Sequence, residues 1–232
     1  MKSGGGTGTA LRRVGAVVRH IVWDWNGTLL DDNDAVVAAV NAVCARYERA
    51  PISLAEWRAV FRRPISACYE DLLGRALTEA DWAAIDGAYH REYNGRLHGL
   101  DLAHDARPAL TGWRARGGTQ SLLSMWFHND LVEMVGRLGI AEHFLRVDGL
   151  KAGIGGESKA AYLKEHLAEL DLDPAEAVLI GDVADDAHAA AGAGIACVLL
   201  TTGISTPEGL AAAGVPVVDS ITAAVDLVRA GR

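Results

Sequence analysis

The sequence has few cysteines, and their placement excludes two kinds of site. Cys44, Cys68 and Cys197 lie far apart and form no CxxC pair, so neither a zinc ribbon nor a thioredoxin-type redox site is indicated. The eight histidines show no HExxH spacing, so a catalytic zinc site is not indicated either. An odd and sparse cysteine count is typical of a reducing compartment, and we therefore expect a cytoplasmic protein.

The sequence also lacks long apolar runs and an excess of positive charge. Runs such as Ile195–Leu200 are too short to cross a bilayer, so we expect no membrane as a partner. Lys and Arg number 22 against 30 Asp and Glu, a net charge of −8, which disfavours binding to nucleic acid. Residues 1–16 are glycine-rich and lack the apolar stretch of a signal peptide, which predicts a disordered tail. No pattern indicates an oligomeric state.

What the sequence does contain is an alternation of strand and helix patterns. The apolar, β-branched run Val17–Trp23 predicts a buried strand. From residue 107 onward, expected helices alternate with expected strands at Gln120–Met125, Phe144–Val147, Ala177–Ile180 and Ala196–Leu200. Repeated units of this kind predict an α/β fold with a Rossmann-like, doubly wound parallel sheet, whose ligands bind at the carboxyl ends of the strands.

The region between the first strand and this alternating part has a helical sequence pattern instead. Apolar residues recur at intervals of three and four across Val36–Tyr47, Leu54–Phe61, Cys68–Leu77 and Trp82–Tyr93, with almost no strand character. We therefore expect a core domain made of residues 17–33 and 100–232. A helical domain of residues 34–99 is expected to be inserted into it after the first strand.

Polar residues stand at the ends of three expected strands. Asp24 ends the first strand, Ser124 ends a second, and Asp182 ends a later one. Two groups of carboxylates at one sheet edge repel each other unless a cation lies between them, and Mg²⁺ accepts such ligands while leaving room for a phosphate. Ser124 and Lys159, at the start of a helix, offer a hydroxyl and a positive charge for phosphate oxygens. The combination favours phosphoryl chemistry.

These residues lie in four motifs that resemble those of the haloacid dehalogenase superfamily. Asp24-Trp25-Asn26-Gly27-Thr28-Leu29 resembles the first motif, Ser124 the second, Lys159 the third and Gly181-Asp182-Val183-Ala184-Asp185-Asp186 the fourth. The layout is similar to that of phosphoglycolate phosphatases. The resemblance implies a Mg²⁺-dependent phosphoric monoester hydrolase that acts on a small phosphorylated metabolite. It also implies that residues 34–99 form a helical cap of type C1, which closes over the site and selects the substrate.

The resemblance further implies a role for each residue of the site. Asp24 is expected to be the nucleophile that forms an aspartyl-phosphate. The expected metal ligands are Asp24, the backbone carbonyl of Asn26, Asp182 and Asp186, and the expected phosphate ligands are Thr28, Ser124 and Lys159. Lys151 competes with Lys159 for the third motif, and Asp185 competes with Asp186 for the last metal position.

Arg62 and Arg63 occupy the part of the expected cap where related enzymes often have a specificity loop. Guanidinium groups suit recognition of a substrate anion. The same two residues also fit a solvated helix end. We carry both forward as candidate substrate-binding residues, with that alternative open.

Asn26 departs from the family pattern, because related phosphatases usually have an aspartate at this position. That aspartate protonates the leaving group and later activates water, and a neutral amide can do neither. Three explanations are open. The substrate has a good leaving group or another group supplies the proton; the protein binds a phosphorylated ligand with little or no turnover; or the asparagine is an introduced substitution. A mutase activity relies on the missing aspartate and is less consistent with the sequence.

Overall fold

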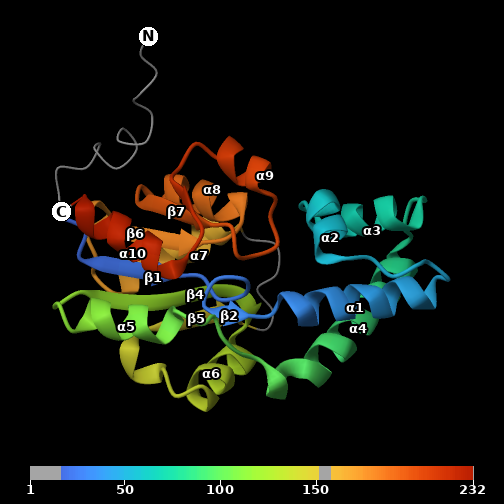
Figure 1. Cartoon of the computed structure of the whole chain (residues 1–232), viewed down its shortest axis with the longest axis horizontal. Coiled ribbons are helices and arrows are strands. Elements are labelled where there is room, and N and C mark those ends of the chain that lie inside the picture. The colour runs from blue at the N-terminus through green and yellow to red at the C-terminus, as the bar shows by residue number, and fades with distance from the viewer. Residues whose placement is uncertain (1–16, 152–157, 232) are drawn as a thin grey trace, which may run out of the picture. The chain divides into compact units, whose positions relative to one another are not determined.

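A computed structural model describes residues 17–151 and 158–231, and a six-stranded parallel sheet is its central feature (Figure 1). The strands lie in the order β5-β4-β1-β6-β7-β8. Their bounds are β1 His20–Trp23, β4 Thr119–Phe127, β5 Val147–Leu150, β6 Ala177–Gly181, β7 Ala196–Leu200 and β8 Val217–Val218. This arrangement confirms the expected α/β class with a Rossmann-like sheet.

Helices cover both faces of this sheet. The helices of this part of the chain are α5 Ala106–Arg114, α6 His128–Arg137, α7 Lys159–Glu169, α8 Ala184–Ala193, α9 Pro207–Ala212 and α10 Ile221–Ala230. One-turn helices lie at Ala141–His143 and Pro174–Glu176. Helices α7 and α8 pack on one face and α5 and α10 on the other. Because both faces are buried, the strands are near-continuous apolar runs rather than alternating ones.

The pleat of β1 decides which side chains face α7. Successive strand residues point to opposite faces, so His20, Val22 and Asp24 share one face. Val22 packs into a buried apolar cluster with Leu163 and Leu167 of α7, which identifies that face. Trp23 points the other way, where its indole N–H donates to Gln120 Oε1 at 3.0 Å.

The chain divides into two compact units, and the smaller one is helical. It comprises Asp31–Asp101 together with Ile204–Thr206, and the remaining described residues form the larger unit. Its helices are α1 Asn33–Arg46, α2 Leu54–Val60, α3 Ile65–Leu73 and α4 Glu79–Arg96, followed by a short turn at Leu97–Gly99. Two short paired strands, β2 Leu30–Asp31 and β3 Asp101–Leu102, lie where the chain passes between the units.

Packing inside the smaller unit centres on α1 and α4, which lie along each other. The hydroxyl of Tyr93 on α4 donates to the buried carboxylate of Asp32 at 2.7 Å, just before α1. The ring of Tyr69 lies 5.7 Å from that of Trp57 and 6.2 Å from that of Trp82, which joins α2, α3 and α4. Aromatic contacts therefore supply much of this unit's core.

The strand expected at Phe144–Val147 is wrong by three residues. The strand β5 begins at Val147, and Leu145 before it is 61% exposed. Asp148 and Gly149 made this segment look unlike a strand. Asp148 is tolerated there because it pairs with His166 and Arg146. Gly149 is required because a Cβ there would lie 2.6 Å from the carbonyl oxygen of Trp126.

The short elements β2, β3, β8 and α9 were not expected, because two to six residues hold too little periodicity. The tail predicted at residues 1–16 lies outside the described residues. Among the described residues, none of the helices is both long enough and apolar enough to cross a membrane.

The buried histidine of β1 predicts a pH-dependent stability. Burial, with a smaller effect of nearby His166, lowers the pKa of His20 from 6.5 to about 4. Between pH 6.5 and about 4 this histidine is protonated in the unfolded chain but not in the folded protein. The free energy of unfolding therefore decreases as the pH falls through this window. We expect wild type to lose about 3 kcal/mol more unfolding free energy than His20→Gln between pH 7 and pH 4.

Denaturant unfolding at a series of pH values measures this difference. Titrating groups that do not interact with His20 contribute to both proteins alike, so they cancel when the variant is subtracted from wild type. A difference that does not change with pH would show that His20 is not held neutral by the fold.

Candidate active site

The register of the sheet brings three separate parts of the sequence to one edge. Trp23, the last residue of β1, pairs with Leu122 of β4 and with Ile180 of β6. Asp24 follows directly and its backbone N–H donates to the carbonyl of Ile180 at 2.9 Å. Asp182 follows the end of β6, and Ser124 lies two residues beyond the paired Leu122. Ser124 was expected to end its strand, but β4 continues to Phe127, so Ser124 lies inside it. The carboxyl ends of β1 and β6 therefore form the site, with β4 beside β1.

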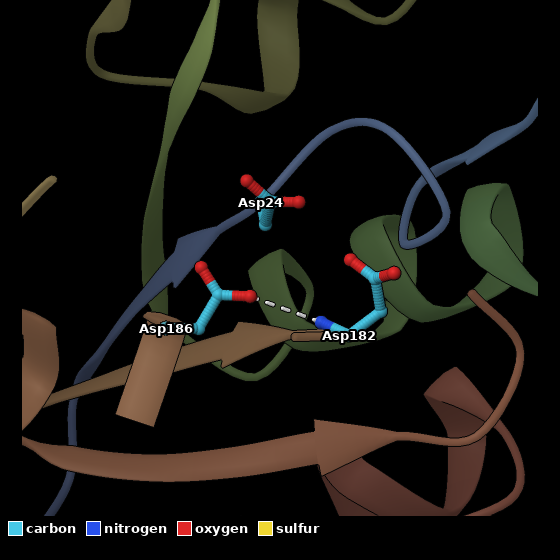
Figure 2. A group of neighbouring side chains, drawn as sticks. All are labelled: Asp24, Asp182 and Asp186. Atoms are coloured by element: carbon cyan, nitrogen blue, oxygen red, sulfur yellow. Dashed lines mark hydrogen bonds between the residues drawn. The ribbon is translucent and has the colours of Figure 1, made fainter. Parts of the chain in front are cut away.

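Three buried carboxylates converge at this edge (Figure 2). Asp24, Asp182 and Asp186 are 7%, 2% and 0% exposed, and one oxygen from each lies within 4.8 Å of the others. Asp24 comes from the end of β1, Asp182 from the end of β6, and Asp186 from the first turn of α8. Desolvation is the main cause that raises the pKa of Asp24, to about 6, and the nearby Lys159 works in the opposite direction.

Lys159 supplies the positive charge of the cluster. It is the first residue of α7, and its ammonium contacts Oδ1 of Asp24 and Oδ1 of Asp186. Burial alone would lower the pKa of Lys159, but the charges of Asp186 and then Asp24 outweigh that effect and raise it. The lysine is therefore charged at neutral pH and holds two carboxylates from different elements together.

Asp186 is fixed by backbone groups as well as by the lysine. Its Oδ2 accepts hydrogen bonds from the N–H groups of Asp182 and Val183, both at 3.1 Å. These donors lie at the N-terminus of α8, where a carboxylate also interacts favourably with the helix dipole. Gly181 is required beside it, because a Cβ there would lie 2.1 Å from Oδ2 of Asp186.

Asp182 packs against two glycine backbones. A Cβ on Gly203 would lie 1.7 Å from Asp182 Oδ2, and one on Gly27 would lie 2.6 Å from it. Gly27 also has a φ of +69°, which favours glycine. The hydroxyl of Thr202 donates to the carbonyl of Gly27 at 3.1 Å and ties the two loops together. Sequence reasoning missed Gly203 and Thr202, because they belong to none of the four motifs.

Two hydroxyls of the candidate phosphate ligands are available to donate. Ser124 Oγ accepts from the backbone N–H of Trp126 at 3.1 Å, which leaves its O–H to donate. Thr28 Oγ1 is buried and has no hydrogen-bond partner among the described residues. A buried hydroxyl without a partner is costly, so it indicates a place for a ligand. Asn26 is half-buried in the turn after β1, where it bridges to Leu30.

The structure brings together Asp24, Lys159, Asp182 and Asp186 and leaves the competing candidates elsewhere. Lys151 is exposed, whereas Lys159 contacts the acidic cluster. Asp185 Oδ1 lies 3.9 Å from Nδ1 of the exposed His188.

The two candidate arginines lie in the smaller unit. Arg62 is held there by Asp71 and by the carbonyls of Val60 and Ala67, the latter at 3.1 Å. Arg63 is exposed. A substrate-binding role for either arginine stays a prediction.

The donor set of the cluster fits a hard divalent cation. Three carboxylates and one ammonium carry a formal charge of −2 when all four groups are ionised. A buried excess of negative charge is unfavourable, and oxygen ligands are those that Mg²⁺ and similar ions prefer. Asp24, Asp182 and Asp186 are placed so that they could hold such an ion together, and a ligand role for the backbone carbonyl of Asn26 stays a prediction.

Comparison with known protein families gives one match that decides the class. Residues 18–194 match the model of the haloacid dehalogenase-like hydrolases. The chain belongs to this family. The membership confirms the resemblance seen in the four motifs and the expectation that the protein is a hydrolase.

Similar proteins agree with this assignment. The chain is 25% identical to phosphoglycolate phosphatase 1 of Pseudomonas aeruginosa over 201 residues, which cover 80% of this chain and 70% of that one. It is 27% identical to the plasmid phosphoglycolate phosphatase of Cupriavidus necator over 224 residues, 91% of this chain and 94% of the other. The structure of a predicted phosphatase from Clostridium acetobutylicum superposes with a TM-score of 0.79 at 14% identity, and covers 93% of this chain and 100% of that one. That likeness shows the fold.

The close approach of Gly203 to Asp182 predicts a specific loss of metal binding. In Gly203→Ala the new methyl must displace the Asp182 carboxylate, because the contact is far shorter than any real Cβ contact. We expect Mg²⁺ to bind at least about tenfold more weakly, or about 1.4 kcal/mol, by isothermal titration. Gly136→Ala is the control, because a Cβ there meets no atom within 4 Å. Equal Mg²⁺ affinity in all three proteins would remove Asp182 from the binding site.

Proposed function

We propose that this hydrolase is a Mg²⁺-dependent phosphatase that removes the phosphoryl group from a small phosphorylated metabolite. The observation that carries the proposal is the buried cluster of Asp24, Asp182 and Asp186 around a single ammonium, Lys159. Its residual negative charge suits a divalent cation, and the hydroxyls of Ser124 and Thr28 are the proposed donors to the phosphate. Phosphoglycolate is the first substrate to test, because the curated relatives carry that name.

The chemistry proceeds in two steps on Asp24. A carboxylate oxygen of Asp24 forms a bond to phosphorus, the ester P–O bond breaks, and the leaving group departs with its electron pair. Water then attacks phosphorus, the acyl phosphate bond breaks, and the carboxylate and inorganic phosphate are released. Lys159 and Ser124 stabilise the charge on the transferring oxygens. Bound Mg²⁺ supplies charge neutralisation for the phosphoryl oxygens.

Asn26 leaves this scheme without its usual proton donor. A departing alkoxide needs a proton, and an amide does not give one. We therefore propose that the enzyme depends on the leaving group, or on another group, for that proton. The same observation favours a second candidate function, a protein that binds a phosphorylated ligand and turns it over slowly or not at all.

The helical unit is proposed to act as the cap of this site. Its place in the chain, between the first and second motifs, supports that role, as does its helical composition. Arg63 and Arg62 remain its candidate anion-binding residues, although Arg62 already bonds to Asp71. We also propose a cytoplasmic location, because Cys44, Cys68 and Cys197 are all free and buried.

The missing carboxyl predicts a steep dependence of the rate on the leaving group. We expect aryl and acyl phosphates to be cleaved far faster than alkyl phosphates such as phosphoglycolate. Asn26→Asp should raise kcat/KM for alkyl esters by up to about 10²-fold and change aryl esters little, because proton transfer limits only the former. Values of kcat/KM across a series of leaving groups, with Mg²⁺, measure both effects.

Asp24→Asn serves as the blank in this series, since an amide is not a nucleophile, and excess chelator serves as a second one. If wild type turns over aryl phosphates, and both Asp24→Asn and excess chelator abolish this turnover, the protein is a phosphatase and not only a binding protein. Turnover that survives chelator would contradict the metal-dependent mechanism. A flat leaving-group dependence with no gain in Asn26→Asp would show that another group supplies the proton, and His90 and His128 would be the first to examine.

A further inference from the structure

A second buried polar cluster lies between the sheet and α7, away from the carboxyl edge. His166 of α7 lies at its centre, with Nδ1 at 2.7 Å from Oδ2 of Asp148 and Nε2 at 2.7 Å from Oγ of Ser121. Ser121 Oγ is also 2.8 Å from Nε2 of His20, and the other ring nitrogen of His20 is 2.8 Å from Oγ1 of Thr119. The chain of contacts joins β1, β4, β5 and α7.

The order Asp148–His166–Ser121 is that of a serine hydrolase triad, but burial excludes that chemistry. Ser121 is 0% exposed and His166 is 1% exposed, so no substrate reaches the hydroxyl. A nucleophile needs access to the reacting atom. The cluster therefore acts inside the protein.

The hydrogen bonds of the cluster form one consistent series. The carboxylate of Asp148 only accepts, so His166 donates to it from Nδ1. With a neutral imidazole, Nε2 of His166 accepts from the hydroxyl of Ser121. Ser121 Oγ then accepts from Nε2–H of His20. Burial raises the pKa of Asp148, but the hydrogen bonds from His166 and Arg146 outweigh it and lower the pKa to about 2, so the acceptor stays ionised. A buried network with every member satisfied fixes one arrangement of its elements.

The position of His166 on α7 links this network to the active site. Lys159, Leu163 and His166 are spaced by four and three residues, so they share one face of the helix. Leu163 packs in the apolar cluster with Val22, and Lys159 contacts Asp24. His166 contacts Ser121, which also contacts His20. His20, Val22 and Asp24 alternate along the same face of β1. Helix α7 thus contacts this side of the sheet through Lys159 and Leu163 at β1 and through His166 at Ser121 of the neighbouring β4.

No side-chain hydrogen bond caps the N-terminal end of α7 among the described residues. Ser158 is its N-cap residue, but the Ser158 side chain makes no capping hydrogen bond. A lysine has a long side chain with several rotatable bonds, so the position of its ammonium depends on how the helix is seated. The next polar contact along this face of α7 is seven residues further on, at His166.

We propose that His166 and Asp148 are positioning residues that seat α7 on the sheet and thereby set where the Lys159 ammonium lies between Asp24 and Asp186. The link is physical and continuous: the carboxylate of β5 fixes the imidazole, and the imidazole fixes the rotation of the helix about its axis. The catalytic consequence rests on the proposed phosphatase function. The seating of Lys159 does not, and it can be measured by itself.

Chemical labelling of lysines measures the seating without any assay of activity. Lys159 has a side chain only 9% exposed, whereas Lys164 on the same helix is exposed and serves as an internal reference. We expect brief acetylation, followed by mass spectrometry, to show at least about a fivefold rise in the Lys159 to Lys164 labelling ratio in Asp148→Ala and in His166→Leu. Asp148→Asn keeps an acceptor for His166 Nδ1–H and should restore most of the protection.

Leu167→Ala is the matched control for loss of stability. Leu167 is buried on α7 beside His166 but belongs to the apolar cluster and not to the polar network. We expect the Lys159 to Lys164 labelling ratio of Leu167→Ala to stay near the wild-type value. This should hold even if Leu167→Ala has a melting temperature as low as that of Asp148→Ala. Circular dichroism establishes that each protein is folded during labelling. If His166→Leu does not fold, the comparison of Asp148→Ala with Asp148→Asn is sufficient for the test.

Kinetics then test the consequence for catalysis. With an aryl phosphate and Mg²⁺, Asp148→Ala should lower kcat about tenfold and change KM less than about twofold, because a misplaced Lys159 weakens stabilisation of the transition state more than substrate binding. A wild type without turnover would overturn the proposed function and leave the labelling result standing. An unchanged labelling ratio in folded Asp148→Ala, or an equal rise in Leu167→Ala, would overturn the positioning role.

Discussion

The ammonium of Lys159 lies between the carboxylates of Asp24 and Asp186, and the rest of the site is arranged around this buried charge. Burial disfavours the ionised form of Asp24 and raises its pKa, and the charge of Lys159 works against that effect. The ammonium compensates part of the negative charge of the three carboxylates, and a net negative charge remains in the cluster. That remaining negative charge fits a divalent cation, which the proposed phosphatase function requires.

Holding this arrangement is a task shared by the whole larger unit. The parallel register places Asp24 between β4 and β6. Backbone N–H groups at the N-terminus of α8 bind Asp186, and Asp182 packs against two glycine backbones. The proposed seating of α7 by His166 extends the same idea to the lysine. Each charged group of the cluster is held by backbone or by a second polar group, which is how sites keep reacting groups in place before the substrate arrives.

The sequence predicted the parts of this account that depend on local pattern. Alternating strand and helix patterns identified the sheet. Three of the four motifs contain Asp24, Lys159, Asp182 and Asp186, which the structure brings together, because these motifs are short and lie at a strand end or helix start. The role of Ser124 stays a prediction. Gly203 and the His166 network were missed for a different reason. His20 and Ser121 are 101 positions apart and Ser121 and His166 are 45 apart, so only the folded sheet brings them together. The position of β5 was missed because Asp148 is tolerated there through its contact with His166, and Gly149 is required by the close approach of Trp126.

The central claim is that Asp24 carries the phosphoryl group during turnover, and direct trapping tests it best. The protein is mixed with Mg²⁺ and an aryl phosphate, quenched during turnover, and treated with borohydride, which reduces an acyl phosphate to the alcohol. Mass spectrometry of the peptides then locates the change. The account predicts that Asp24 alone is reduced, and only when both Mg²⁺ and substrate are present. Steady turnover with an unmodified Asp24, or with the change at another carboxylate, would contradict it.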